Sequence, residues 1–167
     1  NDFNTPEFLR VPEPLIHKQF SRIMSLKDGL KKMSKSDPSD LSRINLTDSK
    51  DEIVNKIKKA KTDPLPLPKN IDELVERPEA ENLLGIYSSL KNQSLQNSID
   101  EFSGKNFSEF KIELSDVLVE KIEPISKKIK ELLNDEKYLD TILLEGSKKA
   151  DTVASKKIKE IKELVGF

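Results

Sequence analysis

The sequence has no cysteine, only one histidine and no long hydrophobic run among its 167 residues. Without cysteine the chain forms no disulfide and offers no thiolate ligand to a metal. With His17 as the lone histidine, its own residues assemble neither a histidine-based metal cluster nor a Ser/His/Asp triad. We interpret His17 as a structural or exposed side chain. Neither common kind of glycine-rich phosphate loop is present, so these sources of catalytic chemistry are excluded.

The chain also lacks an excess of either charge, with 29 Lys and Arg residues against 30 Asp and Glu and a net charge of −1. No overall field therefore draws it to nucleic acid or to an anionic membrane, and any RNA contact must be a local patch. No hydrophobic stretch approaches the length of a membrane span, and no secretory segment opens the chain. We therefore expect a cytoplasmic protein without a membrane partner.

Hydrophobic residues make up 35% of the chain and recur in periodic segments. This favours a folded protein, although another 35% of the residues are charged. The length is sufficient for one ordinary domain with a real core. The chain opens on Asn1 without an initiator methionine, and we interpret it as the back half of a longer protein.

Residues 1–47 are punctuated by prolines, which limit long helices. The run Arg22–Leu26 is apolar between polar flanks and predicts a short buried strand. We expect residues 27–42 to form a mobile loop with a candidate hinge at Gly29, and residues 44–46 to form a short extended piece.

A helix is predicted to begin after Ser49, because Ser49 and Glu52 have capping-box spacing and apolar residues follow at helical intervals. It should end near residues 61–63, since three prolines follow within a few residues. This proline-rich passage predicts a short, stiff and ordered linker.

Beyond residue 71, apolar residues recur every three or four positions and predict helices whose apolar stripes form the core of a bundle. Pro124 is expected to start or kink one of these helices. Gly146, Ala150 and Ala154 recur every fourth residue, which predicts that a neighbouring helix packs closely against them.

The most informative stretch is Lys32–Ser36, which reads Lys-Met-Ser-Lys-Ser. Its two lysines lie three positions apart between hydroxyl side chains, so one loop can place two ammonium groups on a polyphosphate. Such an arrangement stabilises a departing pyrophosphate through charge. We therefore predict that Lys32 and Lys35 are catalytic. The hydroxyls of Ser34 and Ser36 would complete the phosphate cradle, whereas a solvated lysine- and serine-rich loop is the alternative.

Two further residues complete the predicted nucleotide site. The apolar run that contains Ile23 offers a face for a purine ring, and the Met33 backbone can hydrogen-bond the edge of the base. Together with the rest of Lys32–Ser36 they form the predicted cofactor-binding set. No side chain is predicted to be a metal ligand.

The Lys32–Ser36 sequence is identical to the second nucleotide-binding motif of class I aminoacyl-tRNA synthetases. The wider block of residues 22–37 closely resembles the corresponding segment of bacterial tryptophanyl-tRNA synthetases. Further segments that resemble this family lie along most of the chain, at residues 56–63, 77–87, 102–105, 145–150 and 154–155. Because several separate motifs match with their spacing, the chain is identified as a member of this family.

The resemblance implies a mainly α fold with two domains. Residues 1–63 would be the C-terminal remnant of a Rossmann-type α/β nucleotide-binding domain, and residues 64–167 an all-α helical domain that contacts the tRNA anticodon. It also implies that Ile23 and Lys32–Ser36 contact ATP, assisted by Mg²⁺. The implied reaction joins tryptophan to ATP and then transfers it to tRNA(Trp), and the bacterial members are homodimers.

The chain also departs from the family. The first nucleotide motif, a His-Ile-Gly-His-like sequence, is absent, and the residues that grip the indole ring lie upstream in the family. We therefore expect this chain alone to be inactive. A tyrosyl-tRNA synthetase shares the loop chemistry and stays an alternative, although Thr62–Asp63 and residues 150–155 favour tryptophan. The alternative from another class is a non-enzymatic helical module that binds tRNA or a partner through lysine-rich helix faces.

Overall fold

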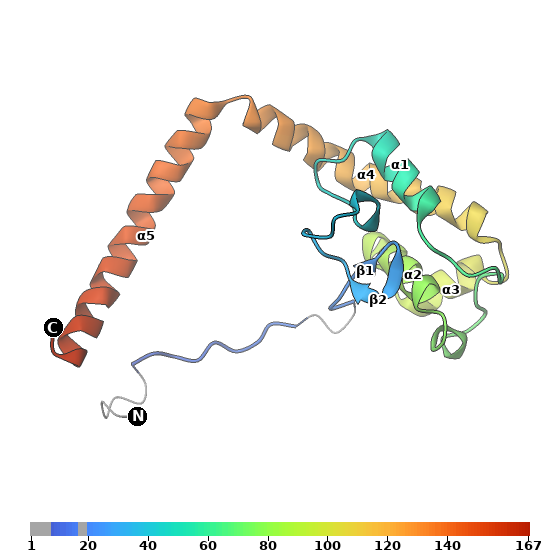
Figure 1. Cartoon of the computed structure of the whole chain (residues 1–167), viewed down its shortest axis with the longest axis horizontal. Coiled ribbons are helices and arrows are strands. Elements are labelled where there is room, and N and C mark those ends of the chain that lie inside the picture. The colour runs from blue at the N-terminus through green and yellow to red at the C-terminus, as the bar shows by residue number, and fades with distance from the viewer. Residues whose placement is uncertain (1–7, 17–19) are drawn as a thin grey trace. The chain divides into compact units, whose positions relative to one another are not determined.

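A computed structural model describes residues 8–16 and 20–167, and His17 lies outside the described residues. Figure 1 shows the elements along the chain, which is mainly α-helical, as the sequence predicts. In order they are β1 (Met24–Ser25), β2 (Asp28–Lys32), the 3-10 helix η1 (Asp40–Ser42), α1 (Lys50–Lys59), the 3-10 helix η2 (Asp72–Leu74), α2 (Pro78–Lys91), α3 (Leu95–Phe102), α4 (Phe107–Leu133) and α5 (Glu136–Val165).

The chain divides into two compact units, which we describe separately. The core unit, residues 16–129, contains both strands, α1 to α3 and most of α4. The tail unit consists of residues 1–15 and 130–167 and contains α5. The functional domain boundary predicted between residues 63 and 64 stays a prediction.

The hydrophobic core lies in the core unit, where residues 82–88 of α2 are all buried. The rings of Tyr87, Phe102 and Phe110 pack edge to face, with centroids between 4.8 and 5.8 Å apart. Further core side chains come from the faces that the periodicity predicts: Ile53 and Ile57 of α1, Ile99 of α3, and Leu114, Val117, Leu118 and Ile122 of α4. The bundle core predicted beyond residue 71 is therefore confirmed for α2, α3 and the first part of α4, and α1 packs against it as well.

An antiparallel hairpin of β1 and β2 is fastened to α2. The buried Asn82 side chain accepts a hydrogen bond from the Met24 amide at 2.8 Å and donates one to the Met24 carbonyl at 2.9 Å. Gly29 lies against the first turn of α2, where an added Cβ would stand 2.6 Å from the Pro78 carbonyl carbon. Gly29 is therefore required for a close approach of two backbones, and the hinge predicted there is wrong.

The loop predicted over residues 27–42 is only partly a loop. Residues 28–32 form β2, and residues 40–42 form η1. The Leu26 amide donates to the Ser42 carbonyl at 2.9 Å, which ties the end of this segment to the hairpin. The β2 sequence, Asp-Gly-Leu-Lys-Lys, has little hydrophobic alternation, because pairing with β1 decides its conformation.

The proline-rich linker is ordered, as predicted. Leu67 is buried, its amide donates to the Lys105 carbonyl at 2.9 Å, and its carbonyl accepts from the Gly104 amide at 3.1 Å. At the start of the linker, the Asp63 carboxylate accepts hydrogen bonds from the Arg77 guanidinium on both of its oxygens, at 2.9 and 2.7 Å. This two-point ion pair fixes the start of the linker beside α2.

Helix ends follow local signals in two places and depart from them in a third. Ser49 and Glu52 form the capping box of α1, as predicted. Gly104 has a φ of 71° just after α3, a conformation that glycine adopts without strain. In contrast, α4 runs through Pro124, so this proline does not start a new helix.

The prediction that a neighbouring helix packs closely on Gly146 is wrong for the chain that the structure describes. No residue of α5 is buried, and a Cβ added at Gly146 would meet no atom within 4 Å. The three- and four-residue periodicity marks an apolar face of α5, but periodicity does not identify what covers such a face. The bundle-core prediction is therefore not confirmed for α5.

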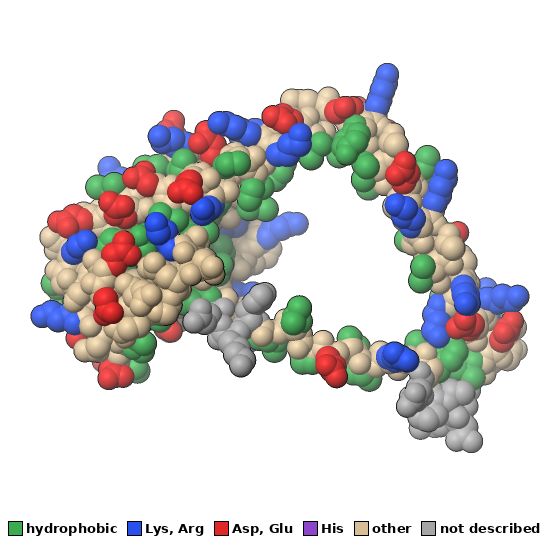
Figure 2. Space-filling model, turned by 180° about the vertical axis from the view of Figure 1, so that it is seen from behind, with side chains coloured by type: hydrophobic (Ala, Val, Ile, Leu, Met, Phe, Trp, Pro, Cys, Tyr) green, Lys and Arg blue, Asp and Glu red, His purple; other side chains and the backbone are tan. Residues whose placement is uncertain are grey.

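Charged side chains of both signs are interspersed on the face shown in Figure 2, in keeping with the net charge of −1. Such mixing favours solvated surface pairs over steering of a ligand by one sign of charge. Among the described helices, none is long and apolar enough to cross a membrane.

Gly29→Ala should destabilise the core unit by about 1–3 kcal/mol, the usual cost of overpacking. The new methyl group would meet backbone atoms of Pro78 and Glu79, which cannot yield as a flexible side chain does. Leu30→Ala is the matched control, because Leu30 is 78% exposed. Urea unfolding should give a lower midpoint for Gly29→Ala only. Equal midpoints for the two variants would show that the contact between β2 and α2 is loose.

Candidate functional site

The hairpin places three of the predicted site residues together. Lys32 ends β2 opposite Met24, and the Met33 amide donates to the Ile23 carbonyl at 3.0 Å. Ile23 is 43% exposed, so its side chain presents accessible apolar surface. Met33 is half-buried and packs against the hydrophobic core. The predicted base-binding residues thus flank the start of the predicted phosphate loop.

Residues 34–37 form a turn, which we call the catalytic turn after the role predicted for Lys35. It is closed by the Asp37 amide, which donates to the Ser34 carbonyl at 3.3 Å. The Ser34 and Ser36 hydroxyls lie 3.0 Å apart, and the Ser36 amide donates to the Ser34 Oγ at 3.3 Å. Lys35 is exposed within the turn, and Lys32 is exposed just before it. Two ammonium groups and two hydroxyls therefore share one solvent-facing segment, which suits an anion with several oxygens.

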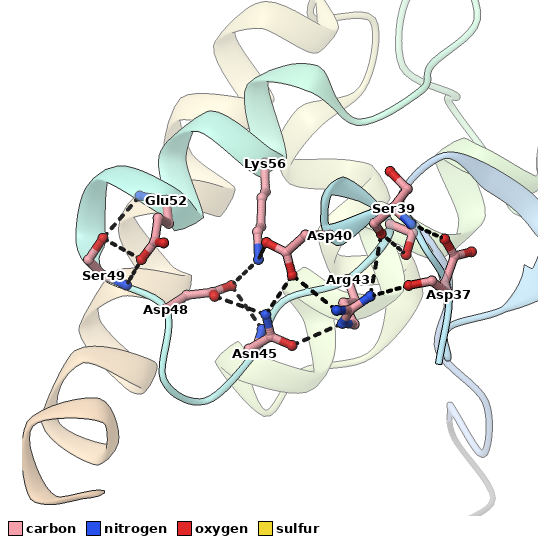
Figure 3. Close-up of polar contacts among 10 residues, drawn as sticks. Asp37, Ser39, Asp40, Arg43, Asn45, Asp48, Ser49, Glu52 and Lys56 are labelled. Carbon is pink, nitrogen blue, oxygen red and sulfur yellow. Dashed lines mark hydrogen bonds and ion pairs between the residues drawn. The ribbon is translucent and has the colours of Figure 1, made fainter. Parts of the chain in front are cut away.

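Beyond this turn, the Arg43 side chain holds the backbone in place (Figure 3). Its Nη1 donates to the carbonyl oxygens of Asp37 and Ser39, at 2.9 and 3.4 Å. Its Nη2 lies 3.1 Å from an Asp40 carboxylate oxygen, and its Nε donates to the Asn45 side chain at 3.1 Å. The guanidinium therefore connects the end of the catalytic turn with the segment that leads to α1.

Behind Arg43 lies the buried ammonium group of Lys56, on α1. Its Nζ lies 2.7 Å from carboxylate oxygens of both Asp40 and Asp48, and its side chain is only 3% exposed (Figure 3). Burial by itself lowers the pKa of Lys56, but the hydrogen bonds that it donates to the two carboxylates outweigh burial and raise this pKa above 10.5. The Lys56 ammonium in turn holds the pKa of Asp40 below its ordinary value.

Sequence reasoning missed this polar network, although one signal pointed to Lys56. Lys56 lies three residues after Ile53 and directly before Ile57, so it shares the buried face of α1. A lysine on a buried face needs a carboxylate partner, because an isolated buried charge is costly. Arg43 and the two carboxylate partners lie outside the long helices, where the sequence gives no comparable periodic signal.

The described residues do not form a metal cage. Within residues 8–16 and 20–167, no three His, Cys, Asp or Glu side chains are arranged to hold a metal ion. A separate groove of about 520 Å³ is lined by residues of α1 and α4 and by Thr62, and none of the predicted site residues lines it. The segment whose chemistry suits a nucleotide phosphate is Lys32–Ser36, with Lys32 at the end of β2 and Lys35 in the turn.

Comparison with known families identifies the class of protein. The family model described as tRNA synthetases class I (W and Y) matches residues 1–139, and the chain therefore belongs to this family. Tryptophan–tRNA ligase of Caulobacter vibrioides is 48% identical over 167 residues, which are 100% of this chain and 48% of that protein. Tryptophan–tRNA ligase of Agrobacterium fabrum is 50% identical over 160 residues, 96% of this chain and 45% of that protein.

Solved structures share the fold. Tryptophanyl-tRNA synthetase from Mycoplasma pneumoniae matches with a TM-score of 0.79 and 26% identity, covering 98% of this chain and 49% of that chain. Tryptophanyl-tRNA synthetase from Campylobacter jejuni, solved in complex with ADP and tryptophan, matches with a TM-score of 0.67 and 24% identity over the same shares. The chain thus spans about half the length of the relatives it matches.

Lys56→Met should destabilise the core unit by about 3–5 kcal/mol, the usual loss when one partner of a buried ion pair is removed. The cause is the Asp48 carboxylate, which is 6% exposed and would lose its ammonium partner. Lys59→Met on the exposed face of α1 is the control and should change stability by less than about 0.5 kcal/mol. Chemical denaturation measures both. Similar midpoints for the two variants would contradict a structural role for Lys56.

The stability difference between the wild-type chain and Lys56→Met should depend on pH. The pKa of Asp40 is lowered on folding, so its contribution is present above 3.8 and is lost as pH falls through the folded value. The pKa of Lys56 is raised, so its contribution is complete below 10.5 and is lost as pH rises through the folded value. The difference in unfolding free energy between the two proteins should be largest between about pH 5 and pH 10. A difference in unfolding free energy that stays constant from acid to alkaline pH would refute this role of the two ionised groups.

Proposed function

We propose that the chain is the carboxyl-terminal part of a tryptophan–tRNA ligase. In the complete enzyme, tryptophan and ATP would form tryptophanyl-adenylate and pyrophosphate, and the tryptophanyl group would then pass to the 3′ end of tRNA(Trp). The observation that carries this proposal is the Lys32–Ser36 motif, exposed at the end of a hairpin in a chain 48% identical to a tryptophan–tRNA ligase. Tryptophan is proposed over tyrosine because the Caulobacter and Agrobacterium relatives both bear the tryptophan name.

The lysines would act on the phosphates of ATP. Lys32 and Lys35 bind these phosphates and neutralise the negative charge that develops as pyrophosphate departs. The hydroxyls of Ser34 and Ser36 donate to phosphate oxygens from the same exposed segment. Mg²⁺ would be held by the phosphates and water, in keeping with its usual preference for few protein ligands beside a nucleotide.

The residues that flank the start of the turn would hold the adenine ring. Ile23 offers its exposed apolar side chain to the ring face. The Met33 amide already donates to the Ile23 carbonyl, so we assign the base-edge contact to the Met33 carbonyl. A carbonyl in this position would accept a hydrogen bond from the exocyclic amine of adenine.

The remaining parts of the enzyme follow from how much of its relatives the chain covers. Since it spans 48% of the Caulobacter ligase, we place the first nucleotide motif and the indole pocket in the half that it does not cover. We propose that residues 64–167 contact the tRNA anticodon and that the complete enzyme is a cytoplasmic homodimer. The 167-residue chain alone is expected to be inactive.

Activity of the complete gene product tests the proposal. It should catalyse ATP–pyrophosphate exchange that depends on tryptophan, and it should charge tRNA(Trp). Exchange that depends on tyrosine would instead establish the tyrosyl alternative. No exchange with either amino acid, combined with tRNA binding by the helical part, would establish a non-enzymatic module.

Lys35→Ala in the complete gene product should slow adenylate formation by about 10²–10³-fold, the usual loss when one donor to a developing charge is removed. Binding of tRNA should be nearly unchanged, because Lys35 would act on the departing phosphates. Lys31→Ala is the matched control. Like Lys35, Lys31 is an exposed lysine, but it lies on β2 and outside the motif. Stopped-flow measurement of adenylation gives both rates. A loss of less than a few-fold for Lys35→Ala would remove Lys35 from the catalytic set.

A further inference from the structure

The catalytic turn, Ser34–Asp37, is held at both ends and exposed between them. At its start, the hairpin holds Met33 through a backbone hydrogen bond. At its end, the Arg43 Nη1 donates to the Asp37 carbonyl at 2.9 Å. The exposed residues between these two anchors include Lys35, so the reach of its ammonium group depends on where the anchors stand.

We propose that Arg43 is a positioning residue for the ATP site and acts through Lys35, an inference that rests on the proposed function. Arg43 lies outside the Lys32–Ser36 motif, and its contacts are with the chain that follows the motif. Its guanidinium spans the carbonyls of Asp37 and Ser39 on one side and the Asp40 carboxylate on the other. It thereby fixes the point at which the catalytic turn rejoins the fold.

We call the contacts of the Arg43 guanidinium with Asp37, Ser39 and Asp40 the clamp, and the surrounding residues hold this clamp in place. The Arg43 side chain is 18% exposed, so water competes little for its contacts. Asp40, which pairs with Arg43, also accepts from the buried Lys56 ammonium on α1, at 2.7 Å (Figure 3). A continuous series of charge-assisted hydrogen bonds therefore runs from the end of the catalytic turn to α1.

Arginine suits this position better than lysine. Its planar fork holds several donors at fixed angles, so it satisfies two carbonyls, a carboxylate and the Asn45 side chain at once. A lysine ammonium keeps the charge but cannot span the same set of acceptors. Lys56 is itself the base of the network, and its loss would threaten the fold. Substitution of Arg43 therefore tests the positioning of Lys35 separately from the stability of the fold.

Loss of the clamp should slow chemistry without weakening the binding of tryptophan. Once the Asp37 carbonyl is released, the end of the turn can drift, and Lys35 no longer meets the departing pyrophosphate at a fixed place. A misplacement of about 1 Å costs a catalytic step about 10²-fold. The site for tryptophan is proposed to lie in the half of the enzyme that this chain does not cover, so the KM for tryptophan should not change.

The experiment compares Arg43→Gln and Arg43→Lys in the complete gene product by single-turnover formation of tryptophanyl-adenylate at saturating ATP and tryptophan. Arg43→Gln should reduce the rate by about 30–100-fold and Arg43→Lys by less. Arg77→Gln is the matched control, because Arg77 makes a two-point ion pair with Asp63 and is 11% exposed. It should lower thermal stability yet keep the adenylation rate within about threefold below the melting temperature.

A double variant separates positioning from general damage. If Arg43 acts through Lys35, the Lys35→Ala/Arg43→Gln enzyme should be about as slow as Lys35→Ala alone. Losses that multiply, or an Arg43→Gln enzyme within about threefold of the wild-type rate, would overturn the positioning role. A wild-type gene product that forms no adenylate would overturn the proposed function, and the role of Arg43 with it. The two failures are therefore distinguishable.

Discussion

The buried ammonium group of Lys56 is the constraint on which the candidate site depends. It joins α1 to Asp40, which follows the catalytic turn, and to Asp48, which precedes the helix. The Lys56 and Asp48 side chains are 3% and 6% exposed, and removing two such charges from water costs several kcal/mol per ion unless they stay paired. Asp40 is 57% exposed and extends the pair toward the turn. The segment between the turn and α1 is consequently held to one geometry, and Arg43 transmits that geometry to the turn.

The opposite end of the turn depends on a different helix. Asn82 of α2 hydrogen-bonds the Met24 backbone as a neighbouring strand would, and Gly29 lets the hairpin approach the start of α2. The start of the turn is thus set by α2 and its end by α1. The contacts of the hairpin with α2 cross the predicted boundary between residues 63 and 64, whereas those with α1 lie on one side of it. The hairpin that carries the predicted nucleotide loop is therefore held directly by α2, a helix that follows the linker.

Local signals in the sequence predicted local structure well, and contacts between distant segments poorly. Ser49 and Glu52 are three residues apart, and their capping box is visible in the sequence. β2 has no periodic signal of its own, because a strand partner and α2 decide its conformation. Gly146 satisfied a small-residue pattern, yet a Cβ added there would meet no side chain or other segment of the described chain within 4 Å. The role of Lys56 could be predicted in part. Its position on the apolar face of α1 implies a carboxylate partner, but the sequence does not show that the partners are Asp40 and Asp48.

Arginine and lysine occupy different kinds of position in this chain, and the difference bears on the proposed chemistry. The chain is rich in lysine, yet arginine stands at two places where one side chain must hold several acceptors, Arg43 beyond the catalytic turn and Arg77 at the linker. A rigid fork suits fixed contacts, whereas a lysine is a compact charge on a flexible stem. Lys32 and Lys35 are exposed, and under the proposed function their flexible stems would let the ammonium groups follow the phosphate oxygens as pyrophosphate departs. The proposed function thus gives the two residue types different tasks. The anchors made by Arg43 would limit where the turn can lie, and the flexible lysine stems would adjust within that limit as charge builds on the leaving group.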